Sequence, residues 1–253
     1  MGKPLFEKYA DDFASSRPSY PYEIKAFLFE HFSIDTKSVV ADIACGTGIF
    51  TQLLSCRPDV GLVVGIDRSH ALLRAGTQFY GDFCFEPVCS CGETTPLKTG
   101  SCDMVTVAQG FHWMQRKKTL AELARILKPY GGLGLVWYRR KDLTMPHEEF
   151  IEDLTRHYNP NYDPTFMDSD YTEILLADGN FCNIGQKKFW DFKTFDLDTY
   201  IKWQRSKSFI GDAMDSEELD EFLAKVKSGI LKFFPNGIIT EEFSYDLIYA
   251  RKR

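Results

Sequence analysis

The sequence predicts an α/β fold built on a parallel sheet. Residues 39–44 form a short apolar run that contains Asp42, and such runs suit a strand buried on both faces of a parallel sheet. The glycine turn 45–48 follows, and apolar residues at helical spacing come next. Two more buried strands are expected over 61–67 and 101–108. Strand, tight turn and helix in this order are typical of an α/β sheet that binds a nucleotide-type ligand.

The glycine turn is the candidate ligand site. Gly46 and Gly48 let a ligand approach bare backbone at a helix N-terminus, where N–H groups are exposed. An ordinary tight turn between strand and helix is the alternative interpretation. Asp42 favours a ligand, because a buried carboxylate is costly unless a ligand ammonium or donors in the loop satisfy it. Thr51 stands where a dinucleotide-binding G-x-G-x-x-G motif has its third glycine, which argues against a dehydrogenase.

Composition limits the classes of partner. The 253 residues can bury one core with a modest cap, and the net charge of −6 is spread evenly, so no nucleic-acid partner is expected. The seven cysteines lack paired C-x-x-C spacings, so we expect reduced thiols and no metal. There is no signal peptide and no apolar run long enough to cross a bilayer. We therefore expect a cytoplasmic chain with no membrane partner, either a monomer or a homodimer.

Hydrophobic spacing assigns the remaining elements. Periodicity weakens over 145–183, where an insertion is expected, and Lys-Pro-Tyr-Gly-Gly at 128–132 is expected to end a helix. Asp103 is expected to be structural, because it begins its strand at the edge away from a ligand. We expect helices over 22–32, 119–127, 197–206 and 216–233, and strands over 39–44, 61–67, 83–88, 101–108, 133–138, 187–192 and 238–250.

Asp67 ends the second predicted strand about 20 residues after the glycines, the distance at which a carboxylate meets a ribose at the neighbouring strand tip. Its two acceptor oxygens could hold both vicinal hydroxyls. The alternative is that Asp67 caps the helix that begins near Ser69.

The stretch Asp42-Ile-Ala-Cys-Gly-Thr-Gly48 resembles motif I (D/E-x-x-x-G-x-G) of the class I S-adenosylmethionine-dependent methyltransferases. The L-K-P-x-G-x-L pattern at 127–133 is shared across that superfamily. The resemblance implies a Rossmann-like, seven-stranded, mostly parallel sheet with helices on both faces, and a small cap from the N-terminal arm and an insertion after the fifth strand. It implies S-adenosylmethionine as cofactor, with contacts from Asp42, Ala44, Gly46, Thr47, Gly48 and Asp67.

The N-terminal arm carries a second resemblance. Phe6-x-x-Tyr9 and Arg17-Pro-x-Tyr20-Pro21 look like the F-x-x-Y…R-P-x-Y-P opening of small-molecule methyltransferases similar to trans-aconitate methyltransferase. In that group the arm closes over the cofactor, which implies cofactor contacts for Tyr20 and Arg17 and a substrate contact for Tyr9. The alternatives are a surface arm that packs its rings on the domain, and an arginine that pairs with a local carboxylate.

The segment after the third strand resembles the family's adenine-contacting A-E-x-L-P-F sequence. This implies adenine-side contacts for Cys91, Gly92 and Glu93, with Arg68 beside them. Cys91 replaces an aspartate that often binds the adenine amino group in related enzymes, so recognition there would depend more on backbone groups. Glu93 could instead cap or pair structurally, and Arg68 could be a solvated side chain.

Substrate is expected where the fourth strand ends. Gln109-Gly-Phe-His112-Trp113 resembles the Q-x-x-H-W segments of small-molecule carboxyl methyltransferases, where donors hold a substrate carboxylate. Gln109, His112 and Trp113 are therefore the candidate catalytic residues, and Gln109 is also a cofactor candidate. Plain packing of the His-Trp pair is the alternative. Trp137 and Tyr138 end the fifth strand, one facing the pocket and the other the core, and Trp137 is a substrate candidate. Trp203 lies in a segment similar to the group's substrate-facing Y-x-x-x-x-R-S helix and is also a candidate, with an amphipathic surface helix as the alternative.

The resemblance predicts one methyltransferase domain over 1–253. Its parts would be an N-terminal lid and helix (1–33), a cofactor-binding core (34–140), a cap insertion (141–185) and the C-terminal part of the sheet (186–253). The expected reaction is methyl transfer to a small molecule, with a carboxylate oxygen as first candidate, because an ionised carboxylate needs no base. Methylation at carbon, nitrogen or a hydroxyl oxygen, and a non-catalytic cofactor-binding partner subunit, are the alternatives.

Overall fold

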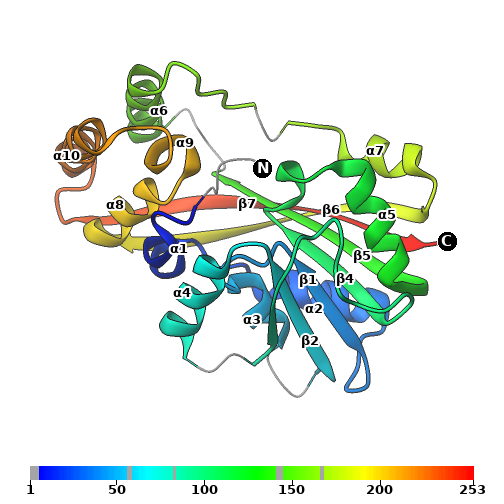
Figure 1. Ribbon diagram of the computed structural model, residues 1–253. Coiled ribbons are helices and arrows are strands. Elements are labelled where there is room, and N and C mark those ends of the chain that lie inside the picture. The colour runs from blue at the N-terminus through cyan, green and yellow to red at the C-terminus, as the bar shows by residue number, and fades with distance from the viewer. Residues whose placement is uncertain (1–5, 56–58, 82–83, 141–144, 166–167) are drawn as a thin grey trace. The chain divides into compact units, whose positions relative to one another are not determined.

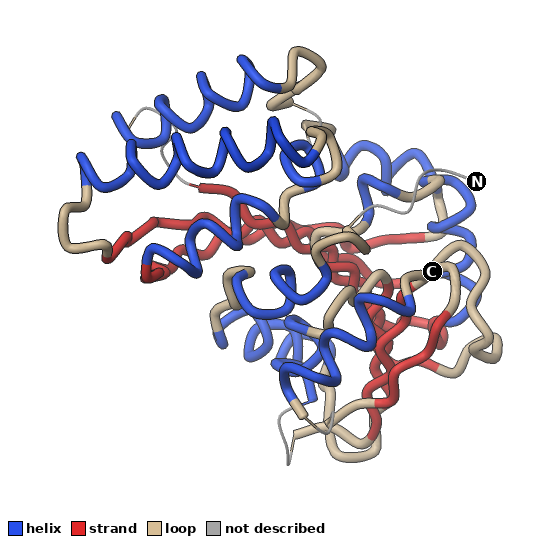
Figure 2. The backbone as a smooth tube through the Cα atoms, turned by 60° about the vertical axis from the view of Figure 1, so that its left-hand side comes forward, coloured by secondary structure: helices blue, strands red, loops and turns tan. Residues whose placement is uncertain are grey.

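The computed structural model describes residues 6–55, 59–81, 84–140, 145–165 and 168–253. Its strands form one seven-stranded sheet in the order β3-β2-β1-β4-β5-β7-β6, drawn in red in Figure 2. The strands are β1 Val39–Ile43, β2 Leu62–Asp67, β3 Glu86–Cys89, β4 Cys102–Ala108, β5 Leu127–Arg140, β6 Phe181–Asp196 and β7 Ile238–Lys252. This sheet and its helices confirm the predicted Rossmann-like fold class.

The chain divides into two compact units. The first unit contains Met1–Pro18, Arg139–Phe166 and Asp191–Phe243, and the second contains Ser19–Tyr138, Met167–Trp190 and Ser244–Arg253. The predicted organisation as one domain with four parts stays a prediction. The helices of the first unit are α1 Ala10–Ser16, α6 Pro146–Tyr158, α8 Leu197–Arg205, α9 Ser208–Gly211 and α10 Ser216–Phe233. The helices of the second unit are α2 Tyr22–Phe32, α3 Ile49–Ser55, α4 His70–Tyr80, α5 Arg116–Ile126 and α7 Tyr171–Asp178, and this unit also contains the 3₁₀ turn η1 Phe111–Trp113.

The predicted strands pair in parallel. β1 pairs with β2 and with β4, so that Asp42 lies opposite Gly65 on one side and Thr106 on the other. β2 also pairs with β3, and β4 with β5. Because parallel strands end at the same edge of the sheet, the loops that follow β1, β2, β3 and β4 meet there. Figure 1 shows β1, β2 and β4 side by side.

Apolar side chains of these strands are buried on both faces, as the uninterrupted runs predict. Val40, Ala41 and Ile43 are fully buried in β1, and Val105 and Val107 are fully buried in β4. The core of the second unit is therefore built on the same residues that predicted the strands.

Three features differ from the prediction or add to it. The helix α5 ends at Ile126, within one residue of the predicted end before 128–132, but the segment 128–132 itself belongs to β5, in which Leu127 and Gly132 pair with β4 across a bulge. Two helices, α6 and α7, lie within the weakly periodic stretch 145–183. Residue 83, which begins the third predicted strand, lies outside the described residues.

No helix in the described part of the chain has the length and apolar character that crossing a bilayer requires.

Candidate active site

The loops at the carboxyl ends of the central strands contact one another through Asp67. Its Oδ2 accepts a hydrogen bond from the backbone N–H of Gly46 at 2.8 Å, and its Oδ1 accepts one from Ser69 at 2.8 Å. The interpretation of Asp67 as a helix cap is wrong, because the Ser69 hydroxyl caps α4 by accepting from Leu72. Asp67 therefore ties the glycine loop to the end of β2.

The loops that follow β3 and β4 also lie against the end of β1. A Cβ on Gly110 would stand 2.5 Å from the Cβ of Ala44, and a Cβ on Gly92 would stand 2.5 Å from a methyl group of Ile43. The segments after β3 and β4 therefore press against the end of β1, and only glycine allows that approach. The structure thus brings Ala44, Gly46, Asp67, Gly92 and the Gln109 segment together, as the parallel topology predicts.

The backbone at two of these tips is held in a conformation that favours glycine. Ala44 has φ +57° and Gln109 has φ +57°, and neither is glycine. Such residues persist only where the surrounding structure holds them, and they are found often at functional sites. Both stand at strand ends that the sequence assigned to the ligand.

Asp42 lies fully buried beneath the glycine loop. Thr51 Oγ1 donates to one of its oxygens at 2.6 Å, and Thr106 Oγ1 donates to the other at 2.8 Å. Burial raises the pKa of Asp42 to about 7; the two threonine hydrogen bonds oppose the rise, and the nearby charge of Asp67 adds to it.

Among the described residues, the hydrogen-bond donors to Asp42 are two threonine hydroxyls, and the contact of Asp42 with a ligand stays a prediction. The donors come from α3 and β4, outside the loop. Thr51 and Thr106 are the site residues that the sequence analysis missed. The available signal was a hydroxyl residue at the position of the absent third glycine.

Two polar atoms of the site are buried without a partner among the described residues: Thr47 Oγ1 and Gln109 Oε1. The other end of the Gln109 amide donates to the backbone oxygen of Tyr138 at 2.7 Å, which fixes the direction in which Oε1 points. A buried acceptor with no donor is costly. The pair therefore fits a ligand that brings N–H donors, such as the ammonium of an amino-acid moiety.

Tyr20 lies in an aromatic cluster of the second unit. Its ring centroid is 4.7 Å from that of Phe50 in α3 and 5.9 Å from that of Tyr138 at the end of β5. Tyr245 is 5.8 Å away and donates its hydroxyl to the backbone of Ser19 at 2.9 Å. The structure thus places Tyr20 against the helix that follows the glycine turn.

His112 has a defined hydrogen-bonding state. The indole N–H of Trp137 donates to His112 Nδ1 at 3.3 Å, and Trp137 itself is 3 % exposed and stacks on Tyr171 with ring centroids 4.2 Å apart. Because Nδ1 accepts this hydrogen bond, the tautomer that fits it carries its proton on Nε2. Trp113 beside it is 46 % exposed. Trp137 therefore lies in the core and contacts His112, whereas Trp113 is exposed.

The residues predicted at the adenine edge differ in exposure. Arg68 and Cys91 are exposed, and Gly92 is buried. Glu93 accepts a hydrogen bond from the backbone N–H of Gln115 at 3.2 Å, which is the structural pairing considered as its alternative. Asp103 is structural, as expected: its Oδ2 accepts from Val39 at 2.8 Å, and both its oxygens contact Lys128 at 2.8 Å.

The remaining predicted residues, Tyr9, Arg17 and Trp203, belong to the first unit. Arg17 donates to the backbone oxygen of Ser206 at 2.6 Å, and its guanidinium lies 4.3 Å from the ring centroid of Phe13. Trp203 is 2 % exposed, and its ring is parallel to that of Phe195.

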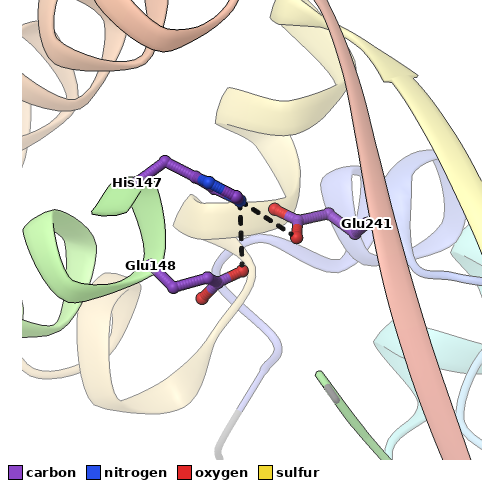
Figure 3. Close-up of side chains that lie close together, drawn as sticks. All are labelled: His147, Glu148 and Glu241. Carbon is purple, nitrogen blue, oxygen red and sulfur yellow. Dashed lines mark hydrogen bonds and ion pairs between the residues drawn. The ribbon is translucent and has the colours of Figure 1, made fainter. Parts of the chain in front are cut away.

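The first unit also contains a buried cluster of His147, Glu148 and Glu241, whose side chains point toward one another in Figure 3. His147 Nε2 lies 3.3 Å from Glu241 Oε2 and 3.8 Å from Glu148 Oε1. Tyr200 donates its hydroxyl to Glu241 at 3.1 Å, and Arg140 forms an ion pair with Glu148. Both carboxylates therefore have partners within this chain.

Comparison with known proteins agrees with this geometry. Residues 41–135 match the family model described as a methyltransferase domain. The chain is 29 % identical over 177 residues to an uncharacterized methyltransferase-like protein of Schizosaccharomyces pombe, covering 69 % of this chain and 66 % of the relative. It is 25 % identical over 240 residues to an uncharacterized methyltransferase of the same yeast, covering 94 % of this chain and 91 % of the relative.

Solved structures share the fold. One carries the name of a type II methyltransferase from Anaeromyxobacter dehalogenans, with a TM-score of 0.66 and 18 % identity, covering 94 % of this chain and 97 % of the other. Another is phosphoethanolamine N-methyltransferase 2 of Haemonchus contortus in complex with S-adenosyl-L-methionine, with a TM-score of 0.54 and 18 % identity, covering 99 % of this chain and 60 % of the other. The family match over residues 41–135 and the relatives support an S-adenosylmethionine-dependent methyltransferase that uses S-adenosylmethionine as its cofactor, and the solved structures share its fold.

Proposed function

We propose that the protein transfers a methyl group from S-adenosylmethionine to a carboxylate oxygen of a small molecule. The observation that carries this proposal is the hydrogen bond from Trp137 to His112 Nδ1. It leaves His112 with Nε2–H as a donor and with no basic nitrogen for the substrate. The indole N–H of the exposed Trp113 is a second donor at the same tip. Two donors and no base suit a nucleophile that is already ionised.

The cofactor supplies a methyl group that is activated by the positive charge on its sulfur. The protein then has to orient the nucleophile and exclude water. A carboxylate is ionised at neutral pH and needs no proton removed, whereas a phenol, an ammonium or a carbon acid does. One relative is named for O-methylation: malonyl-[acyl-carrier protein] O-methyltransferase 1 of Coxiella burnetii is 31 % identical over 142 residues, or 55 % of this chain and 47 % of that protein.

On the cofactor side, we assign the ribose hydroxyls to Asp67 and the amino-acid moiety to the glycine loop. Thr47 Oγ1 and Gln109 Oε1, buried without donors among the described residues, would accept from its ammonium. Asp42 supports the loop from below, and Gly48 allows its turn. The adenine would lie beside Cys91, Gly92, Glu93 and Arg68, and Tyr20 and Arg17 would close over the cofactor.

On the substrate side, we assign His112 and Trp113 to the reacting carboxylate, with Trp137 positioning His112. Tyr9 and Trp203 would line the substrate from the first unit. The proposed partner is a small molecule only, without nucleic acid or membrane, for a cytoplasmic monomer or homodimer similar to the trans-aconitate methyltransferase group. Methylation at carbon, nitrogen or a hydroxyl oxygen, and a role as a non-catalytic cofactor-binding subunit, remain the alternatives.

The test is a methyl-transfer screen over small carboxylic acids, with phenols and amines as comparison substrates and labelled cofactor as the methyl source. The expected product is an ester that releases labelled methanol in alkali. The turnover number should change little between pH 6.5 and pH 9, because no base is required. A tenfold rise in turnover per pH unit below pH 7 would instead assign a general base and exclude this mechanism.

Trp113→Phe and His112→Ala give the residue-level test. Each should lower turnover more than cofactor affinity, because each removes one donor to the substrate. Trp137→Phe should also lower turnover and make it depend on pH, because it frees His112 Nδ1. Loss of cofactor binding in the first two variants would show that these residues belong to the cofactor side.

A further inference from the structure

A buried lysine amino group lies just after α8 and has no carboxylate partner among the described residues. Lys207 is 7 % exposed, and its Nζ donates to Gln204 Oε1 at 2.7 Å. The same atom lies 4.2 Å from the ring centroid of Trp203. Among the described residues, no carboxylate oxygen lies within ion-pair distance of Lys207. Its contacts are thus a neutral amide and aromatic rings.

The neighbouring side chains add further donors. Trp203 is 2 % exposed and Gln204 is fully buried. Trp203 Nε1 and Gln204 Nε2 have no acceptor in the part of the chain that the structure describes. An ammonium has three donors, of which Lys207 uses one on Gln204. The segment 203–207 therefore holds three buried N–H donor groups, and two of them have no acceptor among the described residues.

The surrounding charges do not remove this imbalance. Burial is the largest cause that lowers the pKa of Lys207 well below its ordinary value; Arg140 and Arg17 lower it further, and Glu241 and Glu152 oppose them. The two glutamates have other partners. Tyr200 and His147 contact Glu241, while Tyr162 and Arg156 contact Glu152. A buried cation without a counter-ion is strongly unfavourable.

We propose that Trp203, Gln204 and Lys207 form a binding site for a carboxylate. A carboxylate carries one negative charge, which matches the single unpaired ammonium, and its two oxygens can accept about four hydrogen bonds. A phosphate near −2 would need a second unpaired cation, and Arg140 is already paired with Glu148. Assigning this carboxylate to an acidic substrate rests on the proposed function.

The experiment measures succinate binding to the full chain by calorimetry at pH 8 in two buffers of different ionisation enthalpy. Inorganic phosphate and the uncharged dimethyl succinate are the comparison ligands. We expect succinate to bind, dimethyl succinate not to bind, and the apparent enthalpy to differ between buffers, because an incoming carboxylate makes Lys207 take up a proton. Binding of phosphate without succinate, or no binding by either anion, overturns the proposal.

Lys207→Met keeps the volume and removes the charge, and Lys202→Met, at an exposed position of α8, is the matched control. Lys207→Met should weaken succinate binding at least tenfold and abolish proton uptake, while Lys202→Met should leave both unchanged. Trp203→Phe keeps the ring, removes the N–H and should weaken binding several-fold. A thermal melt checks that each variant is folded. Wild-type affinity in folded Lys207→Met overturns the site.

The two proposals can fail separately. If Lys207→Met loses succinate binding but no carboxylic acid is methylated, the site stands and the proposed function falls. If dicarboxylic acids are methylated and Lys207→Met leaves their KM unchanged, the function stands and the site falls.

Discussion

Asp42 gives a quantitative test of the architecture beneath the glycine loop. The perturbation is Asp42→Asn, which keeps the shape of the side chain and one acceptor oxygen for Thr51 or Thr106. In the wild type, burial holds the pKa of Asp42 at about 7 against an ordinary 3.8. The asparagine cannot ionise. Its effect on stability should therefore depend on pH.

The sign and size follow from proton linkage. The folded state binds the Asp42 proton more tightly than the unfolded chain does. The stabilisation that this proton gives to the folded state is therefore complete below pH 3.8, and it is lost as the pH rises toward 7. A rise of the pKa from 3.8 to about 7 corresponds to about 4 kcal/mol at about 1.4 kcal/mol per pH unit. About 3 kcal/mol of this loss falls between pH 5 and pH 8.

The assay is urea denaturation of wild type and Asp42→Asn at several pH values from 5 to 8. The free energy of unfolding of Asp42→Asn relative to wild type should increase with pH by about 3 kcal/mol over this range. Asp153→Asn is the control, because its carboxylate is 81 % exposed and its substitution should give a difference independent of pH. If the difference in the free energy of unfolding between Asp42→Asn and wild type does not change with pH, the raised pKa of the buried Asp42 carboxyl is refuted.

Three further predictions concern neighbouring residues. Thr51→Val removes a donor to Asp42 and should destabilise the protein by about 1–3 kcal/mol at pH 7, measured by denaturation; an unchanged midpoint would mean that the hydrogen bond contributes nothing. Asp67→Asn should raise the Kd for S-adenosylmethionine by roughly tenfold or more, about 1.4 kcal/mol, measured by calorimetry, and wild-type affinity would remove the ribose assignment. Asp103→Asn should lower stability by up to about 1 kcal/mol, since its ion pair with Lys128 is partly exposed, and should leave cofactor affinity unchanged; weakened cofactor binding would contradict its structural role.

Local sequence patterns were sufficient for the elements that form the cofactor edge. The apolar runs that ended at Asp42 and Asp67 became β1 and β2 with nearly the predicted bounds, because strands buried on both faces show themselves without reference to any other segment. The helix over 216–233 was equally clear and matches α10. The segment 128–132 marks the end of the helix before it, as predicted, but its place in β5 was not predicted, because that depends on pairing with β4.

The sequence by itself determined the order of strands and turns, and therefore which residues stand at the carboxyl edge of the sheet, since both depend on short-range periodicity. Only the tertiary structure decided what those residues do to one another. Thr106 satisfies Asp42 from 64 positions away, and Trp137 sets the proton on His112 from 25 positions away. Lys207 lies against the Trp203 ring, and its burial together with Arg140 and Arg17 lowers its pKa. Such contacts join segments that lie far apart along the chain. The protonation states of these side chains, and the donors that have no acceptor among the described residues, therefore depend on how the chain packs.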